Sequence, residues 1–302
     1  MIQAERGQIS TVVISTALGP SGRGIFPYTL LPGYRRLLRV IKETGAAIFT
    51  KSATRYMRKG NFIPWNPLTW KYIRRLPDQG MLNAYGLTNQ GAEAYAREIK
   101  VAGDRGFKVI PNYYPEFAKG TELAIKDALE ALEIYRQIMG PDFWALELNY
   151  SCPNSEEAIR ENVAQGLKCT QAVRGKFPDL FLIAKISICH PYEFAQELEK
   201  LGLNALHAIN TIPFGIIYPL KRSPLWQAGG GGVSGGPALA AALSYNTRLR
   251  KRVSLPLIMG CGVKNGQDVQ RYLDVGADAV SLCTLALRQP GKAAEIIGRF
   301  NG

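Results

Sequence analysis

The chain has 302 residues, of which 46% are hydrophobic, 20% are charged and 10% are aromatic, and this composition excludes a disordered, collagen-like or disulfide-scaffold protein. The formal net charge is +13, and all of it comes from two stretches, residues 35–75 and 248–252, which argues against a general coat for nucleic acid. No apolar stretch approaches the roughly 18 to 20 residues of a membrane-spanning helix, so a transmembrane segment is not expected.

Short apolar runs alternate along the chain with amphipathic helical patterns. The runs that we interpret as strands are residues 10–16, 46–50, 107–111, 143–148, 180–185, 204–209, 255–259 and 278–282. The helical patterns that follow them are residues 33–44, 91–105, 119–138, 156–175, 191–201, 237–251, 265–275 and 290–300. Eight such units predict an α/β fold in which a parallel sheet closes into a (β/α)8 TIM barrel, with residues 1–302 as a single domain.

Two connections, residues 51–90 and 210–236, are too long to be simple turns. Both follow a predicted strand, so in a barrel both belong to the C-terminal face, where the active sites of this fold are built. We therefore expect them to be active-site loops. The glycine cluster at 229–236 is interpreted as a close approach of the backbone to a ligand.

Polar or small residues follow six of the predicted strands. Lys51 and Lys185 each close an apolar strand, and because lysine is rarely buried unless it is paired, we expect both in the mouth of the barrel. The alternative is a surface lysine whose stem covers apolar atoms. Gly260 and Gly262 follow the seventh strand and Thr284 follows the eighth, where barrels of this kind commonly bind a phosphate.

Cys152 lies in a predicted loop between Ser151 and Pro153, where a thiol can act as nucleophile or general base. The amide side chains expected around it are Asn83, Asn149, Asn154 and Asn210. An amide offers both a donor and an acceptor, which suits the edge of a pyrimidine-like ring. Turn-capping asparagines would explain one or two of the four.

The remaining cysteine and histidine content limits other kinds of site. The chain has five cysteines, no two of them closer than 17 residues, which excludes a CxxC or iron–sulfur spacing and favours a reducing, cytoplasmic setting. His190 and His207 are the two histidines, so no metal site is expected. His207 lies in an apolar run and is interpreted as a core residue with satisfied hydrogen bonds.

The positive charge is concentrated. Between Arg35 and Arg75 there are eleven Lys or Arg residues and one acid, Glu43, and residues 248–252 add four more basic residues. We interpret the segment 35–75 as a patch for an acidic protein partner or a second copy of the chain; a solvated face is the alternative.

The residues 149–154, Asn-Tyr-Ser-Cys-Pro-Asn, resemble the signature of the flavin-dependent dihydroorotate dehydrogenases, in the class that has a cysteine base. Further matches lie at residues 50–52, 58–61, 82–89, 231–235, 262–268 and 276–284, over nearly the whole chain. The cysteine motif with its two asparagines is specific, the glycine motifs are less so, and their order and spacing together carry the resemblance.

This resemblance implies an FMN at the barrel mouth and a pyrimidine substrate, with Cys152 as the base and Lys51 as a second catalytic residue. The residues that it assigns to the cofactor are Ala17, Lys51, Ser52, Asn149, Lys185, Ile209, Gly235, Cys261, Gly262, Cys283 and Thr284. The residues that it assigns to the substrate are Lys51, Asn83, Tyr85, Gly86, Leu87, Asn149, Asn154, Asn210 and Thr211. The implied reaction is oxidation of dihydroorotate to orotate in pyrimidine biosynthesis.

Some residues depart from the family pattern. Cys261 and Cys283 stand where glycine is usual, and Tyr85 replaces a commoner aliphatic residue. Asn210 with Thr211 also resembles the dihydropyrimidine dehydrogenases, which reduce uracil and thymine, so the choice between orotate and uracil stays open. The electron acceptor stays open too, because the chain has no nicotinamide fingerprint.

Two further alternatives belong to other classes. Flavin barrels that reduce uridines in transfer RNA also use a cysteine, and the positive charge would suit RNA. Against this, Ser151 replaces the glycine of their motif, and nucleic acid is not expected as a partner. The other alternative is a barrel that binds a phosphorylated ligand without flavin.

Overall fold

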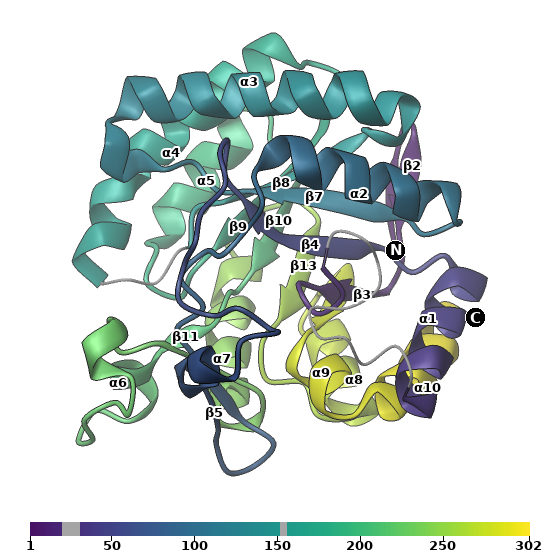
Figure 1. The fold of residues 1–302 in the computed structure, drawn as a ribbon, viewed down its shortest axis with the longest axis vertical. Helices are drawn as coiled ribbons and strands as arrows, with labels where there is room; N and C mark the ends of the chain where they lie inside the picture. The colour runs from purple at the N-terminus through teal and green to yellow at the C-terminus, as the bar shows by residue number, and fades with distance from the viewer. Residues whose placement is uncertain (20–30, 152–155) are drawn as a thin grey trace.

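The centre of the molecule is a closed barrel of eight parallel strands, seen in a computed structural model that describes residues 1–19, 31–151 and 156–302, with only the backbone considered for 156–161 (Figure 1). The barrel strands follow one another around the barrel in chain order. They are β3 (Val12–Ser15), β4 (Ile48–Ala53), β7 (Val109–Tyr113), β8 (Ala145–Asn149), β9 (Phe181–Ile186), β10 (Ala205–Ala208), β13 (Leu257–Gly260) and β14 (Ala279–Leu282). The predicted TIM barrel is confirmed.

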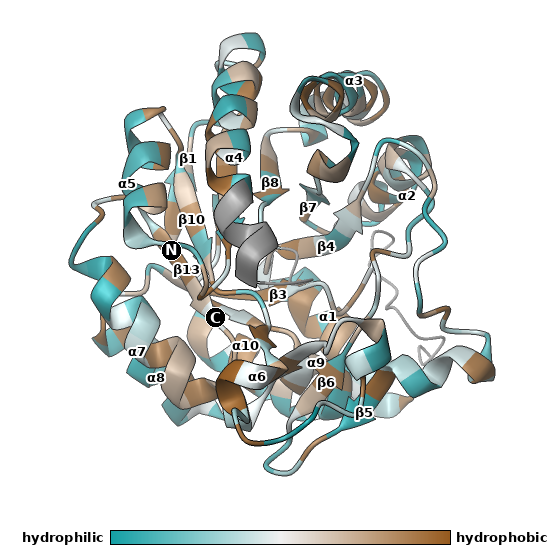
Figure 2. Cartoon of the chain, turned by 90° about the vertical axis from the view of Figure 1, so that its left-hand side faces the viewer, coloured by the Kyte–Doolittle hydropathy of each residue, from teal (hydrophilic) through white to brown (hydrophobic). Residues whose placement is uncertain are grey.

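A helix follows each barrel strand, and the eight helices cover the outside of the barrel. They are α1 (Pro32–Thr44), α2 (Ala92–Asp104), α3 (Thr121–Met139), α4 (Glu156–Lys176), α5 (Tyr192–Lys200), α7 (Leu239–Arg250), α8 (Gly266–Asp274) and α10 (Pro290–Asn301). Figure 2 shows polar and apolar residues alternating along these helices, as expected when one face packs on a sheet. None of the described helices is long and apolar enough to cross a bilayer.

Local signals explain where some of these helices begin and end. Pro32 opens α1, where its missing N–H costs nothing, and Gly45 ends the helix in the left-handed conformation at φ 62°. Asn265 caps α8 by accepting a hydrogen bond from the backbone N–H of Asp268 at 3.0 Å. These short-range signals let the sequence predict helix positions to within a few residues.

The lower part of the barrel interior is apolar. Its buried cluster is formed by inward-facing residues of successive strands and by two residues of an N-terminal hairpin, β1 (Ile2–Ala4) and β2 (Gly7–Ile9). Ile2 and Ile9 of the hairpin belong to this cluster, so the hairpin closes one end of the barrel. The sequence did not predict the hairpin, because its three-residue strands are too short to show a period.

A second, four-stranded antiparallel sheet stands beside the barrel mouth, in the order β11-β12-β6-β5. Its strands are β5 (Ile73–Arg75), β6 (Met81–Asn83), β11 (Ile212–Pro213) and β12 (Gly232–Ser234). Two of these strands come from the connection 51–90 and two from 210–236, so the long connections are held together (Figure 1). A small apolar cluster that includes Leu82 and Val233 supports the sheet.

Short helices complete the connections between these elements. They are α6 (Phe214–Ile217), α9 (Thr284–Arg288) and the 3-10 helices η1 (Pro67–Tyr72), η2 (Phe117–Lys119), η3 (Gly140–Asp142), η4 (Trp226–Ala228) and η5 (Gly236–Ala238). The connection 51–90 thus contains η1, β5 and β6, and the connection 210–236 contains β11, α6, η4 and β12. Neither is a structureless loop.

The basic segment 35–75 is divided among separate elements. Its first part lies on α1, which packs against α10 on the outside of the barrel and pairs Arg36 with Glu295 at 3.0 Å. Lys51 lies in the barrel mouth, and Arg74 and Arg75 lie in β5 of the small sheet. A run of charge that is continuous in the sequence is therefore not one continuous element of the fold.

Candidate active site

A cavity opens at the carboxyl ends of the barrel strands, with the small sheet as one of its walls. Barrel residues that line it include Ser15, Lys51, Asn149, Lys185 and Cys283. From the two long connections come β6, β12 and their flanking residues. The cavity lies on the face where barrels of this fold place their active sites.

The floor of the cavity follows from the two-residue period of the strands, because residues two apart point to the same side. In six strands an inward-facing apolar residue is followed two positions later by a polar one: Val13 and Ser15, Ile110 and Asn112, Ala145 and Glu147, Ile183 and Lys185, Ala205 and His207, Ala279 and Ser281. The barrel interior is thus an apolar layer under a polar one. The cavity stands on the polar layer.

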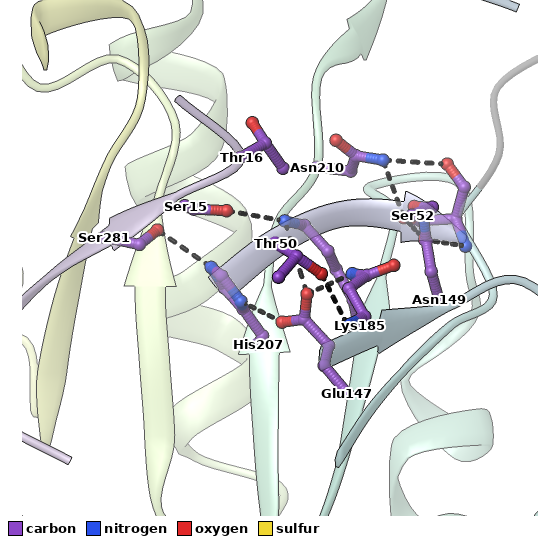
Figure 3. A network of polar contacts seen from close by, with 12 residues as sticks. Ser15, Thr16, Thr50, Ser52, Glu147, Asn149, Lys185, His207, Asn210 and Ser281 are labelled. Carbon is purple, nitrogen blue, oxygen red and sulfur yellow. Dashed lines mark hydrogen bonds and ion pairs between the residues drawn. The ribbon is translucent and has the colours of Figure 1, made fainter. Parts of the chain in front are cut away.

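Glu147 is the centre of this polar layer (Figure 3). Its carboxylate accepts a hydrogen bond from Asn112 Nδ2 and pairs with His207 Nδ1, and Lys185 Nζ lies 3.8 Å from Oε1. His207 Nε2 lies 2.8 Å from Ser281 Oγ. Glu147 is fully buried, so these partners take the place of water around its charge.

The pairing decides which groups are charged. Burial alone raises the pKa of Glu147, but Lys185, His207 and Asn112 together lower that pKa to about 2. Burial and the charge of Lys185 lower the pKa of His207, so its ring is neutral near pH 7. A neutral ring that donates from Nδ1 to Glu147 and accepts at Nε2 from Ser281 satisfies all three side chains. The interpretation of His207 as a satisfied core residue is confirmed, although its ring also lines the cavity.

Lys185 is held on the cavity floor by neighbours from two other strands. Its side chain is 5% exposed, and Nζ donates to Ser15 Oγ at 2.9 Å besides facing Glu147. The ammonium is thus fixed in direction. It presents positive charge to whatever occupies the cavity in a site largely shielded from water, where a charge acts more strongly than in bulk solvent.

Amide side chains form a second chain of contacts beside the lysine. Asn149 Nδ2 donates to Ser52 Oγ at 2.8 Å, and Asn149 Oδ1 accepts from the backbone N–H of Ser151 at 3.0 Å. Asn210 Nδ2 donates to Ser151 Oγ at 2.9 Å. Ser151 thus ties the ends of β8 and β10 together immediately before Cys152.

Lys51 and Tyr85 meet on the other side of the cavity. Lys51 Nζ lies 3.9 Å from the centroid of the Tyr85 ring. Burial raises the pKa of Tyr85 to about 12, so the phenol stays neutral at physiological pH. The ring also packs against Phe62, with centroids 5.1 Å apart.

The loops after β13 and β14 form the remaining wall. Gly262 has φ 103°, and an added Cβ would lie 2.4 Å from Leu239 Cα, so this position requires glycine. Thr284 Oγ1 donates to Ser234 Oγ at 2.8 Å, which joins the barrel to the small sheet. Cys283 Sγ lies 3.1 Å from Thr16 Oγ1.

The structure brings most of the predicted site residues together. Those that line the cavity are Lys51, Ser52, Asn83, Tyr85, Gly86, Leu87, Asn149, Lys185, Ile209, Asn210, Thr211, Cys261, Gly262, Cys283 and Thr284. Ala17 and Gly235 do not line it: Ala17 is fully buried, and Gly235 packs against the backbone of Gln79. Cys152 and Asn154 lie outside the described residues.

The sequence analysis assigned no role in the site to several lining residues, although three of them lie in the motif matches 58–61 and 231–235. They include Ser15, Thr16, Arg58, Asn61, Asn112, Ser234 and Ser281. The two-residue period could have found Ser15, Asn112 and Ser281, since each stands two positions after an inward-facing apolar residue. Ser234 follows from no strand period, because β12 has three residues and is held at the cavity by its pairing with β6.

The comparisons with known proteins agree with this geometry. A family model described as dihydroorotate dehydrogenase matches residues 35–300. The dihydroorotate dehydrogenase B (NAD(+)), catalytic subunit, of Oceanobacillus iheyensis is 30% identical over 264 residues, which cover 84% of this chain and 79% of that protein. Proteins of the same name from Parabacteroides distasonis and Thermotoga petrophila are 28% and 26% identical, over 95% and 92% of this chain and 88% and 92% of theirs. The motif resemblance is therefore confirmed, and the chain belongs to the dihydroorotate dehydrogenase family.

Proposed function

We propose that this protein is an FMN-dependent oxidoreductase that interconverts a dihydropyrimidine and its pyrimidine, with dihydroorotate as the preferred substrate. The observation that carries the proposal is the cavity of a dihydroorotate dehydrogenase family barrel in which Lys51 and Lys185 accompany the amides of Asn83, Asn149 and Asn210. Two cations suit an anionic substrate and an electron-accepting ring, and the amides suit the N–H and C=O groups of a pyrimidine.

The described residues fit a flavin. Asn112 Oδ1 is a buried acceptor with no hydrogen-bond partner among the described residues, and Asn112 lines the cavity. A flavin ring carries an N–H group, which could donate the hydrogen bond that this oxygen does not receive from the described residues. Lys185 would supply positive charge at the same floor, and the loop residues Gly262 and Thr284 would surround the phosphate. Bound FMN would accept hydride from the substrate, which is the chemistry that the protein itself cannot supply.

The protein residues would position the substrate and move its proton. Asn83, Asn149 and Asn210 would orient the pyrimidine ring, and Lys51 would face its carboxylate. Cys152 Sγ, in its position directly after Ser151, would take the proton from the substrate carbon next to the one that loses hydride. The Ser151 contacts with Asn149 and Asn210 support this assignment, because they fix the chain immediately before the thiol.

The electrons must then leave the protein. The relatives are named catalytic subunits with NAD(+) in their names, which supports a route to NAD⁺ through a second protein. We propose an acidic docking face on that protein, because exposed Arg74 and Arg75 lie in the small sheet beside the cavity. A homodimer would avoid bringing these like charges together only if the sheet edge stayed outside its interface. We place the reaction in the cytoplasm.

Anaerobic mixing tests the proposal directly. The purified protein is mixed with dihydroorotate, dihydrouracil or dihydrothymine while the flavin absorbance is followed, and mass spectrometry identifies the released cofactor. Rapid bleaching by dihydroorotate with FMN as the cofactor is the expected result. Bleaching by dihydrouracil alone would reassign the substrate to the uracil type, and the absence of flavin would refute the proposal.

A further inference from the structure

We propose that Tyr85 is a positioning residue that holds the ammonium of Lys51 inside the cavity through a cation–π contact. The Lys51 ammonium lies 3.9 Å from the ring centroid, well within the roughly 6 Å over which such contacts act. Both residues line the cavity. The geometric part of this inference stands on the contact itself, whereas its effect on the reaction rests on the proposed function.

Tyr85 is held both through its backbone and through its ring. The backbone oxygen of Tyr85 accepts hydrogen bonds from the N–H groups of Asn61 and Phe62, at 3.0 and 3.2 Å. The ring packs against Phe62, whose side chain is buried and only 1% exposed. Tyr85 therefore offers a preorganised surface and not a mobile side chain.

The neighbouring chain keeps this surface in place. Arg58 and Asn89 exchange backbone hydrogen bonds of 2.9 and 3.0 Å, which join the two arms of the connection 51–90 on either side of Tyr85. Gly86 has φ 75°, and a Cβ there would lie 2.8 Å from the Asn61 nitrogen. The backbones of the two arms are thus in direct contact, and the fold sets the position of the Tyr85 ring before any ligand binds.

A lysine side chain has a long flexible stem, and an ammonium without a fixed contact samples positions toward water. The face of a neutral aromatic ring attracts the ammonium without neutralising it, unlike a carboxylate. Tyr85 thus supplies Lys51 with a neutral contact at 3.9 Å, which an aliphatic residue at position 85 could not provide.

The first arm of the test measures the contact itself. Lysines of the purified holoprotein are reductively methylated with ¹³C-formaldehyde, and the Lys51 signal is identified by its loss in Lys51→Met. The ring current of Tyr85 should shift this signal upfield in the parent. Tyr85→Phe should keep the shift, and Tyr85→Leu should lose it, with Tyr85→Met in its place if the leucine variant does not fold. An unchanged shift in Tyr85→Leu would overturn the proposal.

The second arm asks whether Tyr85 acts through Lys51. Lys51→Met should make the midpoint potential of the bound flavin more negative, and Tyr85→Leu should move it in the same direction by less, with flavin bleaching roughly tenfold slower. The double variant should equal Lys51→Met. Potential changes that add in the double variant would show that Tyr85 acts independently of Lys51 and would overturn the proposal.

A matched control comes from a similar pair outside the cavity. Lys71 Nζ lies 5.3 Å from the Tyr72 ring, and neither residue lines the cavity. Tyr72→Leu should leave the Lys51 signal and the flavin potential as in the parent; a change as large as that of Tyr85→Leu would overturn the proposal. If no dihydropyrimidine bleaches the flavin, the proposed function fails, while the methyl signal and the potential still decide the role of Tyr85.

Discussion

Replacing Glu147 with Gln removes one negative charge from the centre of the barrel and keeps the shape of the side chain. Glu147 is fully buried and faces Lys185 at 3.8 Å, so the variant leaves a buried ammonium without its carboxylate. The glutamine oxygen can still accept from His207, but its NH₂ group then meets the Asn112 amide that donates to Glu147 in the parent. Asn112 can turn its Oδ1, which has no partner in the part of the chain that the structure describes, to that group, so the lost charge is the main change.

Two routes give the size of the effect. The pKa of Glu147 falls from 4.5 to about 2, and a shift of that size corresponds to roughly 3 kcal/mol of stability for the charged form. Removing one partner of a buried ion pair typically costs about 3–5 kcal/mol. We therefore expect Glu147→Gln to lower the free energy of unfolding by about 3 kcal/mol at pH 7.

Urea denaturation of parent and variant measures this difference, and pH tests its origin. Because the folded pKa of Glu147 is below the unfolded one, its stabilisation is complete above about pH 4.5 and is lost as the pH falls toward 2. The gap between parent and variant should therefore close over that range. Glu295→Gln is the matched control, since Glu295 pairs with Arg36 on the surface and should cost less than about 1 kcal/mol. A loss below about 1 kcal/mol in Glu147→Gln would refute the reasoning.

Three further predictions concern the base, one glycine and one histidine. Cys152→Ala should slow flavin reduction by the substrate by roughly 10²- to 10⁴-fold while FMN stays bound, and equal stopped-flow rates would remove Cys152 from the mechanism. Gly262→Ala should lower the free energy of unfolding by about 1–3 kcal/mol, because φ is 103° and the new Cβ would lie 2.4 Å from Leu239 Cα; an unchanged urea midpoint would contradict this. Burial lowers the pKa of His190 from 6.5 to about 4, so the unfolded chain binds a proton at a higher pH than the folded one. The free energy of unfolding should therefore fall by about 2 kcal/mol as the pH is lowered from 7.5 to 5. His190→Asn should flatten this pH dependence, and an identical slope in the variant would count against it.

The sequence alone determined the barrel and most of its strand ends. Each strand of the barrel is a short, mainly apolar run and the outer helices carry an amphipathic period, so local patterns suffice to count eight units. Lys51 and Lys185 could be placed at the mouth because each follows such a run, and both line the cavity. The period of a strand is a property of consecutive residues, so it can be recognised in the sequence without knowledge of the fold.

Only the tertiary structure decided which side chains become partners. Asn112, Glu147 and His207 come from three strands, and closure of the barrel sets the register that joins them. The small sheet pairs Gly232 with Asn83 across about half the chain, through strands of three residues that are too short to carry a periodic signal. The contact between Lys51 and Tyr85 likewise depends on how the connection 51–90 folds back over the barrel. A sequence records which residues stand at strand ends. Strand register and loop packing determine which charges are neutralised, and both depend on contacts between distant parts of the chain.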